Sequence, residues 1–299
     1  MKILLAGGGS SHEREVSLKS SAAMERALQD LGYEYKYIQF DNELNVIHEW
    51  DASFDMVLLG FHGRAAEDGL LQAFLEANQI PYSGAGVAAS LLAFSKDASK
   101  RQFVNHGIPT AAWELLHHEP GHELPKTRLD LPYVIKPDDE GSTIGLSVCN
   151  TAEDLVNARE ISGAFSRLIF ETFIPGRELT VGVVGDQVYP IVEIFPGHTL
   201  YDYESKYTKG MSRYVCPAEL DEKTTRLIQD YAVGAMDSAG VQVYGRVDFR
   251  LDPQGKPWCL EINTLPGMTE TSLLPMGALA HGLNFAQLIA EIIQQSLKK

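Results

Sequence analysis

The chain has 299 residues, of which 44% are hydrophobic and 22% charged, and its formal net charge is −15 at pH 7. This length exceeds one compact core of ordinary size, so we expect two or three packed substructures and enough chain for an enzyme. No apolar run approaches the ~20 residues of a membrane-spanning helix, and the negative charge opposes general affinity for nucleic acid. We therefore expect a cytoplasmic globular protein with neither a membrane nor a nucleic-acid partner.

The first eighty or so residues alternate between predicted strands and predicted helices. Lys2 to Ala6 is an apolar run too short for a signal peptide, and it ends in three glycines. Met24, Ala27, Leu28 and Leu31 then follow at helical spacing, with Gly32 as a stop. Further strands are predicted at 35–40 and 55–61, and a helix at 69–78. This alternation predicts a parallel α/β domain over residues 1–84.

A second, smaller α+β unit is predicted over residues 85–175. The stretch 84–89 resembles a GxGxxA dinucleotide turn, but no acidic residue stands ~20 positions further on, so we interpret it as a helix entry. A helix is predicted at 96–106 and a strand at 133–136. Gly141 to Gly145 then forms a glycine-bounded loop that leads into another strand.

A third domain is predicted over residues 176–299. Strands are expected at 178–184 and 188–195, and helices around 227–235 and 285–293. Between them, residues 197–213 are polar and show little periodicity. We expect this segment to be a mobile loop.

Three cysteines, Cys149, Cys216 and Cys259, are odd in number, far apart and without a CxxC spacing. This pattern argues against a disulfide framework and against a structural zinc site. We expect reduced thiols in the core.

The most informative segment is a predicted hairpin with arms 245–251 and 257–263. A turn centred between Gln254 and Gly255 places Arg246 opposite Asn263 and Asp248 opposite Glu261, while Val247, Phe249, Leu260 and Ile262 share the other face. Facing carboxylates repel unless a cation neutralises them, and a hard divalent ion with oxygen ligands does so well. The polar face therefore predicts a magnesium site beside a nucleotide, and a solvated face with an Arg-Asp ion pair is the alternative.

A series of short motifs in a fixed order extends along the whole chain. They are Gly9 to Leu18, Phe61-His62-Gly63-Arg64 with Glu67-Asp68-Gly69, Ile80 to Gly84, Lys136-Pro137 with Glu140-Gly141-Ser142, Gly176 to Thr180, Tyr201 to Tyr207, Arg246-x-Asp248, Glu261 to Thr269, and Ser272-Leu273. This series resembles the D-alanine-D-alanine ligases of the ATP-grasp superfamily.

The resemblance implies a three-domain fold in which two antiparallel sheets clasp ATP. Residues implied in phosphate binding are Lys96, Lys136 and the loop lysine Lys206. Those implied in adenine and ribose binding are Glu171, Thr172, Phe173, Ile174 and Glu178. Asp248, Glu261 and Asn263 would bind two magnesium ions, with manganese as a possible replacement.

The resemblance also implies the substrate residues. Glu13 would hold the ammonium group of the first D-alanine, with Ser142 and Tyr207 as its hydrogen-bonding partners and His62 lining the pocket. Arg246 would stabilise charge on the reacting carbonyl. Ser272 and Leu273 would receive the carboxylate of the second D-alanine, and Gly267 completes the implied substrate residues.

The implied reaction forms D-alanyl-D-alanine for peptidoglycan precursors, through an acyl phosphate made from ATP, in an enzyme that is commonly a homodimer. An acyl phosphate must be kept from water, so the implied mechanism makes the loop 197–213 a lid. The open alternatives are a ligase of the same mechanism for another amino-acid pair, or for D-alanine with D-serine or D-lactate. A catalytically silent ATP-binding protein and a Rossmann-type oxidoreductase are the rivals from other classes.

Two departures from the family pattern bear on substrate choice. Where the family has a glycine in His-Gly-x-x-Gly-Glu-Asp-Gly, this chain has Ala66, preceded by Ala65. If the backbone there needs a positive φ, an alanine costs on the order of 1 kcal/mol. Thr143 stands where a second serine is common.

Overall fold

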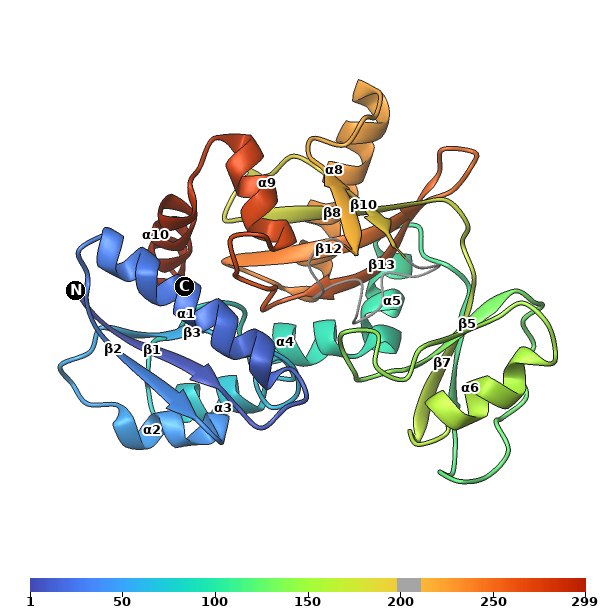
Figure 1. Cartoon of the computed structure of the whole chain (residues 1–299), viewed down its shortest axis with the longest axis horizontal. Coiled ribbons are helices and arrows are strands. Elements are labelled where there is room, and N and C mark those ends of the chain that lie inside the picture. The colour runs from blue at the N-terminus through green and yellow to red at the C-terminus, as the bar shows by residue number, and fades with distance from the viewer. Residues whose placement is uncertain (198–210) are drawn as a thin grey trace.

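The structure is a computed structural model that describes residues 1–197 and 211–299. Figure 1 shows three β-sheets in separate parts of the molecule: one near the N-terminus, one around β5 and β7, and the largest between them around β8 and β12. Lys206, Tyr207 and most of the predicted lid 197–213 lie outside the described residues. The division into domains at residues 84 and 175 stays a prediction.

The N-terminal part is the predicted parallel α/β unit. Its three-stranded sheet has the order β2-β1-β3, and both pairings with the central strand are parallel. Strand β1 is apolar and buried from Ile3 onward because helices cover both faces of the sheet. The elements are β1 (Lys2–Gly8), α1 (Arg14–Asp30), β2 (Glu34–Phe40), η1 (Glu43–Asn45), α2 (Val46–Glu49), β3 (Met56–Leu59) and α3 (Leu70–Ala77).

The middle of the chain forms a four-stranded antiparallel sheet with the order β4-β7-β5-β6. Its small core contains Tyr133, Ile135, Cys149, Leu168 and Phe170. The helices α4 and α5, by contrast, share a core with the largest sheet. The elements are α4 (Val87–Phe94), α5 (Lys96–Asn105), β4 (Trp113–His117), β5 (Tyr133–Pro137), β6 (Ser147–Cys149), α6 (Asp154–Ser162) and β7 (Arg167–Thr172).

The largest sheet has the order β11-β10-β8-β12-β13, with β9 paired to β8. All of its pairings are antiparallel. The elements are β8 (Arg177–Val184), β9 (Gln187–Val188), β10 (Val192–Pro196), β11 (Ser212–Val215), α8 (Glu222–Ala239), β12 (Tyr244–Leu251), β13 (Pro257–Asn263), α9 (Leu273–His281) and α10 (Phe285–Ser296).

The predicted strand at 188–195 is wrong in one respect, because it is split into β9 and β10. Pro190 lies in the gap, and proline has no N–H to donate to a neighbouring strand. The hairpin is confirmed near its open end, where Arg246 pairs with Asn263 and Asp248 with Glu261.

Nearer the turn, the predicted face of the hairpin is wrong for one residue. The register shifts between Asp248 and Phe249, so that Phe249 pairs with Cys259 and Leu260 is the extra residue of a β-bulge. Cys259 is fully buried, whereas Leu260 is half-buried and lies on the cavity side. The bulge therefore exchanges the faces of these two residues.

The C-terminal helix returns to the N-terminal sheet. Its buried residues Leu288, Ile289, Ile292 and Ile293 belong to the same core as Ile3 to Ala6 of β1. In Figure 1, α10 lies next to α1, and the two helices are in contact.

The three cysteines have no disulfide: Cys149 and Cys259 are buried, and Cys216 is half-buried. In the described parts of the chain, no single helix has the length and apolar character to cross a membrane, while α9 and α10 together meet that criterion only as a pair bent by 100°.

Candidate active site

All the predicted site residues that the structure describes line one or both of two neighbouring cavities. The larger has a volume of about 440 Å³ and contains the predicted substrate residues Glu13, His62, Ser142, Arg246, Gly267, Ser272 and Leu273, together with Asn263. The smaller contains the predicted nucleotide residues Lys96, Lys136, Glu171, Thr172, Phe173, Ile174 and Glu178, together with Asp248. Gly141, Ser142 and Glu261 line both cavities, so the two meet there.

A buried group of charges forms one wall of the smaller cavity. Glu171 on β7 is 3% exposed, and its Oε2 lies 3.2 Å from the Nζ of Lys136 and 2.7 Å from the Nζ of Lys100. Burial alone would raise the pKa of Glu171, but the two lysines hold it below its ordinary value. Sequence reasoning missed Lys100, which stands four residues after Lys96 on the same side of α5.

Lys96 is the first residue of α5 and is also buried. Its Nζ donates to the backbone oxygen of Glu140 at 2.5 Å and lies 3.8 Å from the Oε2 of Glu261. Burial lowers the pKa of Lys96, and Glu261 partly offsets this effect. Two of the three predicted phosphate lysines, Lys96 and Lys136, thus reach the cavity from a helix and from a strand.

The smaller cavity also has an apolar part of its lining. It consists of Val134, Ile144, Leu146, Phe173, Ile174 and Leu260. At its rim, Arg250 donates to the Oε2 of Glu178 at 3.2 Å and to the backbone oxygen of Ile174 at 3.1 Å. This arrangement, with an apolar slot and a carboxylate at its edge, suits a flat base and a neighbouring hydroxylated ring. Arg250, which orients Glu178, was not predicted.

The predicted metal ligands meet as the hairpin register requires. Asp248 accepts two hydrogen bonds from Arg246 at 2.9 and 2.8 Å, one from the Oγ1 of Thr180 at 2.5 Å, and one from the Nδ2 of Asn263 at 3.0 Å. Within residues 1–197 and 211–299, no three His, Cys, Asp or Glu side chains are grouped to hold a metal. The set of Asp248, Glu261 and the amide of Asn263 has the all-oxygen chemistry that magnesium prefers, and a metal would compete with Arg246 for Asp248.

Glu13 and Ser142 close one side of the larger cavity. Glu13 is 9% exposed and directly precedes α1, and its Oε1 accepts a hydrogen bond from the hydroxyl of Ser142. Ser142 adopts a left-handed backbone conformation, with a φ of 49°, in the loop that follows β5. Residues 129 positions apart in the sequence therefore meet at the junction of the two cavities.

His62 lines the same cavity as Glu13 and is 5% exposed. Its Nε2 is 2.8 Å from the Oγ of Ser20, and its Nδ1 is 2.7 Å from the backbone oxygen of Leu265. Burial opposes its protonation, but Glu67 and then Glu13 raise the pKa of His62 above its ordinary value. A cation at this position would support the carboxylate of Glu13.

The start of helix α9 also lines the larger cavity. Ser272 is its N-terminal flanking residue and has an extended backbone, and Leu273 is the first helical residue. The unpaired N–H groups and the dipole of a helix N-terminus favour a carboxylate. The helix itself was not predicted from the sequence, although both residues were predicted to receive a carboxylate.

The chain is similar to known proteins in sequence and in structure. Residues 103–294 match a family model described as D-ala D-ala ligase C-terminus. A D-alanine-D-alanine ligase of Methylacidiphilum infernorum is 42% identical, over 98% of this chain and 95% of its own.

Among solved structures, a D-alanine-D-alanine ligase from Bacillus anthracis complexed with ATP has a TM-score of 0.86 and 29% identity, over 100% of this chain and 98% of that one. The VanG D-Ala:D-Ser ligase from Enterococcus faecalis has a TM-score of 0.82 and 25% identity, over 99% of both chains. By sequence and by fold, the chain belongs to the D-alanine-D-alanine ligase family and has its ATP-grasp architecture.

Proposed function

We propose that this protein is an ATP-dependent ligase that joins two D-alanines into D-alanyl-D-alanine. One observation carries the proposal: the cavity with the lysines and the cavity with Glu13 and Arg246 meet at Gly141, Ser142 and Glu261. A phosphate bound on one side is then next to a carboxylate bound on the other. The names of its relatives support the same activity.

ATP would occupy the smaller cavity. Phe173, Ile174 and Leu260 would contact the adenine, Glu178 the ribose, and Lys96 and Lys136 the phosphates. The apolar slot supplies a dry surface for the base, and the lysines supply the positive charge that a transferred phosphoryl group requires. Lys206 is proposed to reach the γ-phosphate.

Magnesium, or manganese in its place, would be held by Asp248, Glu261 and Asn263. When bound, it would neutralise phosphate charge. The chain's own contribution is to hold these oxygens on adjacent strands, where the paired register of Asp248 and Glu261 keeps them on one face.

The two amino acids would occupy the larger cavity. Glu13 would bind the ammonium of the first, supported by His62 and Ser142. The carboxylate of this first D-alanine would attack the γ-phosphorus of ATP, which forms the acyl phosphate and breaks the bond to ADP, the leaving group. The second D-alanine, with its ammonium deprotonated to the amine, would then attack the acyl carbon, which forms the amide bond and releases phosphate.

During this attack, Arg246 would stabilise the negative charge on the carbonyl oxygen. Ser272 and the start of α9 would hold the second carboxylate, with Gly267 beside them. Segment 197–213, with Tyr207, is proposed as the lid that keeps water from the acyl phosphate. A homodimer, a place in the cytoplasm and a role in peptidoglycan precursor synthesis complete the proposal.

The test is phosphate release from Mg-ATP with D- and L-amino acids added singly and in pairs, and with mass detection of the product. D-alanyl-D-alanine together with stoichiometric phosphate supports the proposal. Turnover only with D-alanine and D-serine would keep the mechanism and favour the second candidate, to which the similarity with a D-Ala:D-Ser ligase points. ATP binding without turnover under any pair would instead identify a silent ATP-binding protein.

A further inference from the structure

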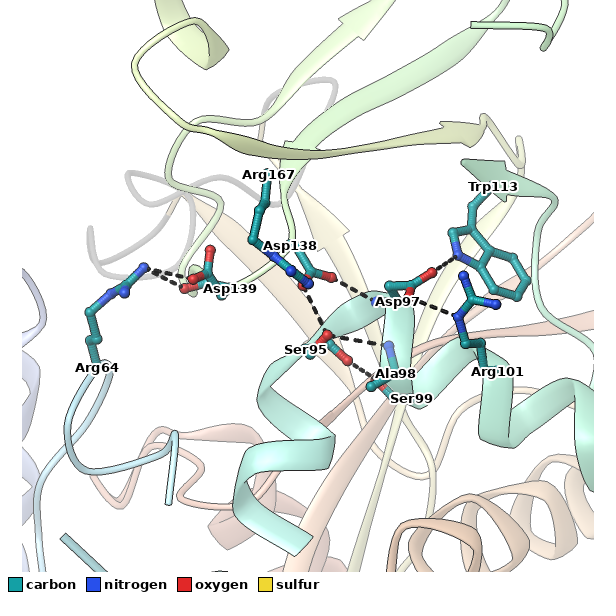
Figure 2. Close-up of polar contacts among 10 residues, drawn as sticks. All are labelled: Arg64, Ser95, Asp97, Ala98, Ser99, Arg101, Trp113, Asp138, Asp139 and Arg167. Atoms are coloured by element: carbon teal, nitrogen blue, oxygen red, sulfur yellow. Dashed lines mark hydrogen bonds and ion pairs between the residues drawn. The ribbon is translucent and has the colours of Figure 1, made fainter. Parts of the chain in front are cut away.

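A buried aspartate outside the predicted site connects the two segments that carry the phosphate lysines. Asp138 follows Lys136 and Pro137 at the end of β5 and is 1% exposed. Figure 2 shows its side chain directed at the first turn of α5, between Ser95 and Asp97. No role for Asp138 follows from the proposed function alone.

The first turn of α5 depends on this residue. The N–H of Lys96 donates to the backbone oxygen of Asp138 at 3.1 Å, and the N–H of Asp97 donates to its Oδ1 at 2.8 Å. The N–H of Ala98 donates to the Oγ of Ser95 at 3.3 Å. The first N–H groups of a helix have no partner within the helix, so Asp138 caps two of them from another element.

The second carboxylate oxygen of Asp138 is equally well bound. Its Oδ2 accepts from the Oγ of Ser95 at 2.9 Å and from Nη2 of Arg167 at 2.7 Å. Arg167 also fixes the backbone, because its carbonyl accepts from the N–H of Asp138 at 3.1 Å. The guanidinium and the positive end of the helix together balance a carboxylate that is shielded from water.

Asp138 therefore connects the backbone that carries Lys96 with the backbone that carries Lys136. We propose that Asp138 is a positioning residue that holds Lys96 and Lys136 at the correct separation for the phosphates of a nucleotide. This inference rests on the proposed function, because it assumes that both lysines bind phosphate. It predicts that the charge of Asp138 matters for ATP affinity although Asp138 does not line either main cavity.

The test compares two capping aspartates in the full-length protein. Asp138→Asn should weaken Mg-ATP binding by roughly tenfold or more, because small displacements of charged groups have large effects in such sites. The matched control is Asp221→Asn, which removes the same charge from the cap of α8, where Asp221 accepts from the N–H of Thr224 at 2.9 Å. The control should change ATP affinity by less than about twofold while lowering the melting temperature.

Two further variants keep the inference falsifiable. If Asp138→Asn does not fold, Ser95→Ala removes one donor to Asp138 without a change of charge, and it should weaken ATP binding in the same direction. In a Lys96→Met background, Asp138→Asn should have a clearly smaller effect, because the part of its action that runs through Lys96 is already lost. Unchanged ATP affinity in the folded variant, or an undiminished effect in the Lys96→Met background, would overturn the inference.

Binding of Mg-ATP to the wild-type protein distinguishes a failure of the proposed function from a failure of the positioning role. A wild-type protein that binds no Mg-ATP contradicts the proposed function itself. A wild-type protein that binds Mg-ATP, with an affinity that Asp138→Asn leaves unchanged, contradicts only the positioning role.

Discussion

At the scale of the residue, one position with a strained backbone is Ala65. We expected any positive φ at Ala66, but Ala65 has a φ of 70°, whereas Ala66 is fully buried with an ordinary backbone. A left-handed conformation costs an L-residue on the order of 1 kcal/mol, and glycine adopts it freely. The alanine that replaces the family's glycine, Ala66, is therefore unstrained, and the strain lies at its neighbour Ala65.

Substitutions at these two alanines should act in opposite directions. Ala65→Gly should stabilise the fold by up to about 1 kcal/mol because it removes the strain. Ala66→Gly should destabilise it by about 1–2 kcal/mol because it removes a buried methyl group and loosens the unfolded chain. Urea unfolding of both variants checks the prediction, and equal signs would contradict it.

Lys100 is predicted to be essential for stability through its charge. It is fully buried beside Glu171, and its Nζ also donates to the Oγ1 of Thr110 at 2.6 Å. Lys100→Met should cost about 3–5 kcal/mol, because it leaves Glu171 with Lys136 as its remaining ion-pair partner in the buried group. Adding Glu171→Gln should recover part of this loss, as denaturant titration of the single and double variants would show. Additive losses would exclude the coupling.

The thiols should be unreactive in the folded protein. Burial raises the pKa of Cys149 and of Cys216 to about 11, and that of Cys259 well above its ordinary value. The thiolate is the reactive form, so alkylation at pH 7 should be slow and should rise only as the pH approaches these values. Counting alkylated thiols by mass in native and denaturing buffer tests this, and rapid native labelling would argue against it.

Much of the site follows from local pattern, and the missing residues show what pattern cannot supply. Asp248 and Glu261 could be paired from strand alternation because both lie on one hairpin with a short turn. The roles of Asp138 and Lys100 could not be predicted, because their partners are on other elements. Asp138 contacts Asp97, 41 positions away, and Lys100 contacts Glu171, 71 positions away. A capping carboxylate supplied by a distant strand leaves no signature near the helix that it caps.

At the scale of the element, irregularities account for the errors in the predicted strands and helices. The bulge at Leu260 does not interrupt the alternation of the sequence, so the pattern alone indicates a regular strand. Helix α9 was missed because Pro275 and Gly277 lower its helix propensity, although proline is compatible with a first turn. In both places, tertiary packing decides between local alternatives.

The bulge assigns opposite roles to two apolar residues of β13. Leu260→Ala should cost less than about 1 kcal/mol of stability but weaken ATP binding, because Leu260 lines the smaller cavity. Ile262→Ala should cost about 2–5 kcal/mol, because Ile262 is 5% exposed in the core, and it should leave ATP binding nearly unchanged. A regular strand would place both side chains on one face, so similar behaviour of the two variants would contradict the bulge.

At the scale of the whole molecule, the last helix completes the first core. Ile292 is fully buried against the N-terminal sheet, while Leu297, five residues further on at the end of α10, is 51% exposed. Ile292→Ala should cost about 2–5 kcal/mol, and the control Leu297→Ala less than about 0.5 kcal/mol. Limited proteolysis of Ile292→Ala should cleave first within residues 1–84; cleavage confined to α10 itself would show that the N-terminal unit does not depend on it.

This return of α10 has a consequence for the synthesis of the protein. The ribosome releases β1 long before it releases Leu288, Ile289, Ile292 and Ile293, which cover the sheet around Ile3 to Ala6. At about 5–20 residues per second, the interval between the release of β3, which completes the sheet, and the release of these helix residues is roughly 10–50 seconds. During that interval its apolar face is a substrate for chaperones, whereas the sheet formed by β4 to β7 has its own core and can fold as soon as it emerges.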